Sequence, residues 1–215
     1  MSLDLVSAEL TIVAVSGSLH YPSKTTSLVT ELAEQLGTRL DAVPHLVRID
    51  RVGPLLAGAL RRSELPPEVE QELRAIETAD VLIVASPVYR ASFTGLFKHL
   101  FDFVDQYALV DTPVLVAATG GSERHALILE HQFRPLFGFF QALTLPVGVY
   151  AHDSDFEGSV ISSPRLAERI AKAVAKSMPI IVSSLNERTE IRRAIDGEFE
   201  RAVEVDARRP VRLDA

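Results

Sequence analysis

The 215-residue chain contains no cysteine. This absence excludes disulfides, cysteine-ligated zinc sites, cysteine-bound iron–sulfur clusters and thiol nucleophiles. Long apolar runs are absent as well. The longest of them, such as residues 81–85, fall far short of the roughly 20 residues that a membrane-spanning helix needs. We therefore expect no association with a membrane.

Positive charge is in the minority, with 22 Lys and Arg against 29 Asp and Glu and a formal net charge of -7. Because no basic run is present, nucleic acid is not expected as a partner. Residues 1–9 carry acids and no basic side chain, so we do not expect a signal peptide there. The composition is that of a globular protein, and a cytoplasmic enzyme or carrier is the starting expectation.

Short apolar runs alternate with segments of helical periodicity. The runs predict five buried strands, at residues 10–15, 45–49, 80–85, 113–118 and 146–151. Helices are expected at residues 25–40, 66–78, 93–107, 123–143 and 164–185. Gly53-Pro54 and Gly58 favour a loop within residues 51–64.

This alternation predicts an α/β fold. We expect a flavodoxin-like, doubly wound, five-stranded parallel sheet in the order 2-1-3-4-5, with helices on both faces. One such domain would span residues 1–185. Residues 186–215 would form a charged C-terminal extension that is partly helical or disordered. Ligands of such sheets bind beyond the carboxyl ends of the strands, so the loops after strands one, three and four are the candidate site.

The first of these loops, at residues 16–27, is rich in hydroxyl groups. Backbone amides at the start of the following helix, together with these hydroxyls, suit a phosphate group. His20 and Lys24 could add positive charge. Capping of the helix explains part of the pattern, but five hydroxyls in ten residues exceed what a cap requires. The hydroxyl-bearing candidates are Ser18, Ser23, Thr25, Thr26 and Ser27.

Two common phosphate-binding patterns are not met in this loop. Lys24 lies seven residues after Gly17 instead of six, and Ser23 stands where the P-loop has its second glycine. A nucleotide kinase is therefore disfavoured. Gly17 alone does not make the dinucleotide fingerprint G-x-G-x-x-G. A hydroxyl-rich loop without either pattern is typical of FMN-binding flavodoxin-like folds.

The other two loops contain residues suited to a flat ring. In Pro87-Val88-Tyr89-Arg90, the proline restricts the turn and backbone amides follow it. In Thr119-Gly120-Gly121-Ser122, the glycines allow the backbone to approach a ligand closely. Each loop by itself is also compatible with an ordinary turn. Their joint position after successive strands is what favours a ligand site.

These residues resemble the NAD(P)H-dependent FMN reductases. The resemblance covers roughly residues 10–156. It is carried by Gly17-Ser18 with the hydroxyl cluster, and by Ser86-Pro87-Val88-Tyr89 followed by Ser92, Gly95, Lys98 and Asp102. Residues 118–125, followed by His131, Arg134 and Pro135, are similar to the flavin reductases of two-component sulfonate monooxygenases, particularly the methanesulfonate branch.

The resemblance implies a role for each loop. The FMN phosphate would be held by the five hydroxyl residues of the first loop and by His20. Pro87, Val88, Tyr89 and Arg90 would border the isoalloxazine ring. The loop at residues 119–122 would line the other edge of the ring and the nicotinamide approach. Relatives usually have Arg where this chain has His20, so phosphate affinity would be weaker or pH-dependent, with Lys24 as a possible compensation.

The helix expected at residues 123–143 contains Pro135, which has no amide hydrogen for the carbonyl of His131. A kink or a π-bulge is therefore predicted between these two residues. Flavin reductases of the two-component type carry such a bulge, with an aromatic side chain that stacks across a subunit interface near the flavin. By position, the resemblance assigns that place to His131, although a surface histidine beside a proline kink is the alternative.

The resulting functional prediction is an enzyme that transfers a hydride from nicotinamide C4 to flavin N5. No acid–base side chain is required, and none is assigned. By the resemblance, reduced FMN would pass to a partner monooxygenase, and the protein would form a homodimer or homotetramer. The alternatives are a quinone or azo reductase with permanently bound FMN, or a flavodoxin-like electron carrier. The choice between NADH and NADPH is left open.

Overall fold

The computed structural model describes residues 10–207, with side chains described through residue 190. Its central sheet is parallel throughout, in the order β2-β1-β3-β4-β5, with β6 also paired to β4. The predicted strand order is therefore confirmed. The strands are β1 (Ile12–Ser16), β2 (His45–Arg48), β3 (Val81–Pro87), β4 (Pro113–Gly120), β5 (Leu143–Thr144) and β6 (Val149–His152).

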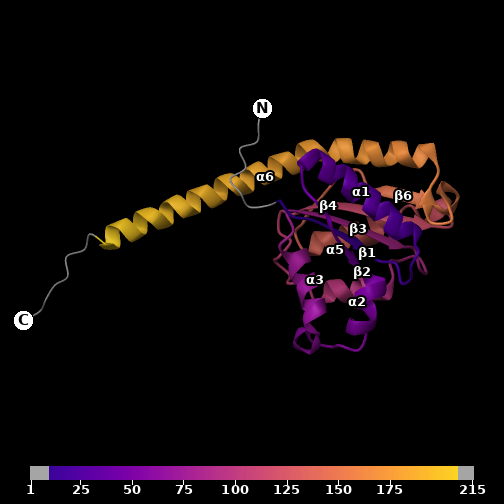
Figure 1. The fold of residues 1–215 in the computed structure, drawn as a ribbon, viewed down its shortest axis with the longest axis horizontal. Helices are drawn as coiled ribbons and strands as arrows, with labels where there is room; N and C mark the ends of the chain where they lie inside the picture. Colours follow the sequence, from indigo (N-terminus) through magenta and orange to yellow (C-terminus); the bar gives the residue numbers. More distant parts are fainter. Residues whose placement is uncertain (1–9, 208–215) are drawn as a thin grey trace, which may run out of the picture.

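Helices cover both faces of the sheet (Figure 1). One face is packed by α1 (Lys24–Leu40) and α6 (Pro164–Ala207), and the other by α2 (Ile49–Leu56), α3 (Pro67–Glu77), α4 (Gly95–Asp102) and α5 (Arg134–Phe139). Alternate residues of β1 enter opposite cores: Ile12 and Ala14 pack with α1, whereas Val13 and Val15 pack on the other face. Burial on both faces explains why the strands read as continuous apolar runs.

The fifth predicted strand, at residues 146–151, forms only in part, as β6, and the short β5 precedes it at the end of the segment that was predicted to be helical. Leu145 still donates its amide to the Val114 carbonyl at 2.9 Å, but Pro146 has no amide to continue the ladder. Pairing with β4 resumes at Val149, which lies opposite Ala117. A short hairpin follows, made of β7 (Phe156–Glu157) and β8 (Val160–Ile161).

The predicted loop at residues 51–64 is wrong in its first part, which forms α2 despite Pro54. Ile49, Val52 and Leu56 are buried along one side of this helix, so packing outweighs the cost of the proline. The predicted helix at residues 93–107 is shorter than expected. It forms α4, which begins after Thr94, whose side chain accepts a hydrogen bond from the Phe97 amide.

The long helix predicted at residues 123–143 is not continuous. It is divided into a 3-10 turn at Glu123–His125, a π-helix at Leu129–Phe133 and α5. Pro135 lies at the start of α5, where a missing amide is tolerated. The predicted π-bulge is confirmed, and His131 lies at its centre.

The closing helix extends beyond the predicted end at residue 185. Ser184 donates to the Asp111 carbonyl at 3.2 Å, and Arg188 donates to Thr112 Oγ1 at 2.7 Å. Beyond these contacts α6 runs away from the sheet to Ala207 (Figure 1). The rest of the predicted extension, and residues 1–9, lie outside the described residues. Among the helices that the structure describes, none is both long and apolar enough to span a membrane.

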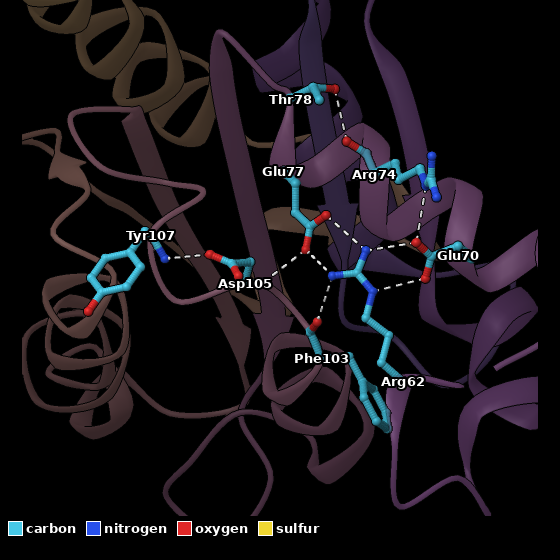
Figure 2. Close-up of polar contacts among 8 residues, drawn as sticks. All are labelled: Arg62, Glu70, Arg74, Glu77, Thr78, Phe103, Asp105 and Tyr107. Carbon is cyan, nitrogen blue, oxygen red and sulfur yellow. Dashed lines mark hydrogen bonds and ion pairs between the residues drawn. The ribbon is translucent and has the colours of Figure 1, made fainter. Parts of the chain in front are cut away.

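An arginine-centred network fastens α3 to the segment after α4 (Figure 2). Arg62 lies in a 3-10 turn (Arg62–Glu64) and forms a two-pronged pair with Glu70, with both distances at 2.9 Å. It also pairs with Glu77 and donates to the Phe103 carbonyl. Glu77 in turn accepts the Asp105 amide at 2.9 Å, so this network anchors the chain where α4 ends.

Replacement of Glu70 tests this network. Hydrogen bonds from Arg62 hold the pKa of Glu70 at about 2, below the ordinary 4.5. The stabilisation is therefore complete above pH 4.5 and is lost as the pH falls toward 2. Glu70→Gln should lower the free energy of unfolding at pH 7 by about 1 kcal/mol, the scale of a partly exposed, well-formed ion pair.

Urea denaturation at pH 7 and pH 3 measures this effect. The difference between wild type and Glu70→Gln should shrink at pH 3. Glu68→Gln, at an exposed position in the first turn of the same helix, is the matched control. An equal difference at both pH values would contradict the assignment of the stabilisation to the Glu70 carboxylate.

Candidate functional site

The three predicted loops meet at one edge of the sheet, where β1, β3 and β4 end. The Gly17 amide donates to the Ala85 carbonyl at 2.6 Å, which joins the first loop to β3. The Val88 amide donates to the Thr119 carbonyl at 2.8 Å, which joins the second loop to β4. Their proximity follows from the topology, because parallel strands present their carboxyl ends at the same edge.

The first loop places its hydroxyl groups around the start of α1. Ser23 caps the helix, accepting the Thr26 amide at 3.3 Å. Thr26 shares a hydrogen bond of 2.8 Å with Ser16, and Thr25 shares one of 2.6 Å with Thr119 of β4. These buried contacts fix the helix start against the sheet edge. The predicted proximity of the first and third loops is thus a direct contact in the structure.

Two of the predicted hydroxyls are committed elsewhere. Ser18 donates to the His20 carbonyl at 3.0 Å, and Ser27 donates to the Ser23 carbonyl at 3.2 Å. A serine has one hydroxyl proton, so neither can donate to a phosphate in this arrangement. The amides of Lys24 and Thr25, in the first turn of α1, are the better donors, since the first helical amides lack intrahelical partners.

Charge at the first loop is largely compensated. The Lys24 ammonium lies 2.8 Å from the Asp153 carboxylate, which belongs to the 3-10 turn after β6 (Asp153–Asp155). His20 is exposed on the loop. The sequence did not indicate that Lys24 has an acidic partner, because Asp153 lies 129 positions away. The donor set for an anion is therefore mostly neutral.

Arg48, at the end of β2, is a further residue that holds the first loop. Its guanidinium lies 4.1 Å from the centre of the Tyr21 ring and makes two hydrogen bonds to Asp50, at 3.0 and 2.6 Å. A cation over an aromatic face is attracted by the ring's quadrupole. Arg48 was not among the predicted residues, because periodicity gives no information on which strand end lies beside the loop.

The second loop is a tight turn. Tyr89 and Ser92 exchange backbone hydrogen bonds at 2.8 and 3.1 Å, and the two residues between them, Arg90 and Ala91, have φ angles of 51° and 65°. Left-handed backbone costs a non-glycine residue roughly 1 kcal/mol or more, and such strain concentrates at functional sites. Tyr89 and Arg90 are exposed at the tip of the turn.

The π-helix lies against this turn. Ser92 Oγ donates to Gln132 Oε1 at 3.1 Å, so the residue next to His131 contacts the loop predicted to border the flavin. His131 itself is exposed. The spacing of His131 and Pro135 predicted the π-helix, but Gln132 was missed because nothing in the sequence pairs it with Ser92.

The third loop is packed against β6. A Cβ at Gly120 would collide with the Tyr150 hydroxyl, and one at Gly121 would lie 3.2 Å from the Asp153 carboxylate. Tyr150 and His152 make side-chain hydrogen bonds to the backbone of this loop. Tyr150 lies in the predicted fifth strand and His152 directly follows it, but no pattern in the sequence indicates that the third loop folds back onto them.

This arrangement fits FMN. Neutral hydroxyls and helix-start amides suit a phosphate, and the turn at Tyr89–Ser92 and the glycine loop at residues 120–121 lie beside it on adjacent strands. The fit rests on two features. One is the chemistry of the hydrogen-bond donors, and the other is the glycine backbone at residues 120–121, which carries no side chains of its own. In the described part of the chain, no group of three His, Asp or Glu residues is arranged to hold a metal ion.

Comparison with known proteins shows the family of this chain. The model of the family described as NADPH-dependent FMN reductase matches residues 10–157. NADH-dependent FMN reductase SfnE of Pseudomonas putida is 53% identical over 175 residues, covering 81% of this chain and 94% of that protein. FMN reductase (NADPH) of Pseudomonas aeruginosa is 50% identical over 169 residues, covering 79% of this chain and 91% of that protein.

Two solved structures are similar over most of the chain. An oxidoreductase from Corynebacterium diphtheriae has a TM-score of 0.73 at 32% identity, covering 82% of this chain and 99% of the other. The apo form of the NADH:FMN oxidoreductase EMOB has a TM-score of 0.69 at 30% identity, covering 81% of this chain and 89% of the other. The chain belongs to the NADPH-dependent FMN reductase family and is a flavin reductase of flavodoxin-like fold.

Proposed function

We propose that this enzyme takes up FMN, reduces it with NADH or NADPH and releases it to a partner monooxygenase, in the metabolism of sulfonate sulfur. The single observation that supports release is the compensated charge of the first loop, where Lys24 pairs with Asp153. A phosphate held mainly by neutral donors is bound less tightly than one held by unpaired cations. We also propose that the protein works in the cytoplasm as a homodimer or homotetramer.

In this proposal the chain acts by binding and orientation. When bound, FMN supplies the N5 atom that accepts a hydride from nicotinamide C4. The first loop holds the phosphate end through the amides of Lys24 and Thr25 at the start of α1, with His20, Ser23, Thr25 and Thr26 beside them. The second loop, Pro87 to Arg90, and the third, Thr119 to Ser122, border the ring and leave one face for the nicotinamide. Holding the two rings in register supplies the rate effect, so no acid or base is needed.

The assay that tests this function follows the absorbance of NADH, and separately of NADPH, with and without free FMN. Oxidation that requires added FMN and saturates with it supports the proposal. A purified yellow protein that oxidises the nucleotide without added FMN favours a quinone or azo reductase with permanently bound flavin. FMN binding without any oxidation of NADH or NADPH would favour the alternative of a flavodoxin-like electron carrier.

The phosphate assignment predicts the behaviour of a double variant. Thr25→Val with Thr26→Val removes the hydroxyls that hold the start of α1 against Ser16 and Thr119. FMN binding should weaken by about 1–3 kcal/mol, the scale of lost buried hydrogen bonds. Riboflavin, which has no phosphate, should lose less affinity than FMN.

Fluorescence titration with FMN and riboflavin measures both affinities. Thr38→Val is the matched control, since its hydroxyl donates to the Glu34 carbonyl near the other end of α1. Unchanged FMN affinity in the double variant would remove the first loop from the proposed phosphate site.

The assignment of His131 predicts a second phenotype. His131→Ala should change FMN retention or the oligomeric state, with little effect on folding, because the side chain is exposed on the π-helix beside the second loop. Size-exclusion chromatography with light scattering, flavin titration and thermal melting separate these effects. His45→Ala, an exposed histidine at the amino end of β2, serves as the control. Unchanged assembly, affinity and turnover would refute this role.

We further propose that residues 1–185 form the FMN-binding domain and residues 186–215 an appendage. Support comes from the contacts of α6, whose last described bonds to the rest of the domain are made by Ser184 and Arg188 to residues 110–112, just before β4. A chain ending at residue 190 should fold and retain the wild-type KM for FMN. Circular dichroism and the FMN-dependent assay test this. Loss of folding would show that the part of α6 after residue 190 belongs to the domain.

A further inference from the structure

Two side chains of β6 are directed at consecutive carbonyl groups of the third loop. The Tyr150 hydroxyl donates to the Ser122 carbonyl at 2.6 Å, and His152 Nε2 lies 3.0 Å from the Gly121 carbonyl. Residues two apart on a strand share one face, and the intervening Ala151 is buried in the opposite core. β6 therefore presents a tyrosine and a histidine together to one short stretch of backbone.

The hydrogen-bond network assigns the histidine proton. His152 Nδ1 accepts from the Ser154 amide at 3.1 Å, so Nε2 is the nitrogen that carries hydrogen and donates to the Gly121 carbonyl. The backbone of His152 is held as well, since its amide donates to Asp155 at 2.9 Å and Asp155 pairs with Arg169 at 2.6 Å. The imidazole is thus fixed in position and tautomer.

Tyrosine at position 150 is suited to hold the Ser122 carbonyl. Burial raises the pKa of Tyr150, so its hydroxyl stays protonated and remains a donor. The same hydroxyl occupies the space that a side chain at Gly120 would need. Gly120 and Gly121 have the most backbone freedom of any residue type, so a loop containing both requires outside contacts to adopt one conformation.

The orientation of the Gly121 and Ser122 carbonyls also determines where the amides of the following residues point. In a planar trans peptide the N–H of the next residue points opposite to the carbonyl. With the Gly121 and Ser122 carbonyls turned toward β6, the amides of Ser122 and Glu123 point to the side away from β6. Paired amides on one side of a loop are ready donors for an acceptor edge such as that of a flavin ring.

We propose that Tyr150 and His152 are positioning residues that hold the Gly121 and Ser122 carbonyls and so present the amides of Ser122 and Glu123 to the flavin ring. This inference rests on the proposed function, because it assumes that the third loop borders the ring. It assigns a role in flavin affinity to two residues that contact the loop from behind, and it assigns no part in hydride transfer to either side chain.

The test compares Tyr150→Phe, His152→Leu and His152→Gln. Loss of one fixing hydrogen bond should raise the KM for FMN by about tenfold while kcat changes less than about twofold. His152→Gln keeps an N–H donor within reach of the Gly121 carbonyl and should restore most of the affinity that His152→Leu loses. The dissociation constant for riboflavin should rise by the same factor as that for FMN, since the loop borders the ring and not the phosphate.

Tyr107→Phe is the matched control for the lost hydroxyl. Tyr107 is exposed and precedes β4, at the amino end of the sheet, opposite the site. Figure 2 shows its hydroxyl directed away from the Arg62 network. This variant should match wild type in both affinities.

The outcomes separate this inference from the proposed function. If wild type neither binds nor reduces FMN, the proposed function fails. If wild type is active and both Tyr150→Phe and His152→Leu keep its affinities, or lose only thermal stability, the positioning role is overturned. Weakened FMN binding with unchanged riboflavin binding also overturns it. If Tyr150→Phe fails to fold, the comparison of His152→Gln with His152→Leu still tests the positioning role.

Discussion

The close approach of β1 to β3 at Gly17 is the constraint on which the site depends. A Cβ at this position would lie 2.8 Å from the Ser86 side chain and 2.9 Å from the Phe97 ring. Because none is present, the Gly17 amide bonds to Ala85, and its carbonyl accepts the Thr94 hydroxyl at 2.8 Å. One glycine thus brings the first loop, the end of β3 and the start of α4 together.

From that junction the three loops are supported in different ways. The first loop is held by hydroxyl contacts of its own and by Thr119 of β4. The second is a strained turn that contacts the π-helix through Gln132. The third carries the glycines and is held by side chains of β6. The first loop thus combines contacts within its own segment with contacts to β4, whereas the second and third loops are held mainly by distant segments.

This difference explains what could be predicted from the sequence. Strands buried on both faces are visible as apolar runs, and their order follows from the alternation with helices. The π-helix was predictable from Pro135, because a missing amide acts locally. By contrast, α2 forms across Pro54 because Ile49 and Leu56 are buried, and β6 meets the third loop through contacts far apart in sequence. Tertiary packing decides such features, so periodicity does not reveal them.

The charge distribution has a functional consequence of its own. Lys24 adjoins the amides of the first turn of α1, which attract an anion, but it pairs with Asp153 from the segment after β6. A phosphate entering this loop would compete with that carboxylate for the ammonium. Asp153 also lies close to Gly121 of the third loop, so one short turn contacts both the first and the third loop. A shift of this turn would loosen both loops together, as the proposed release of flavin would require.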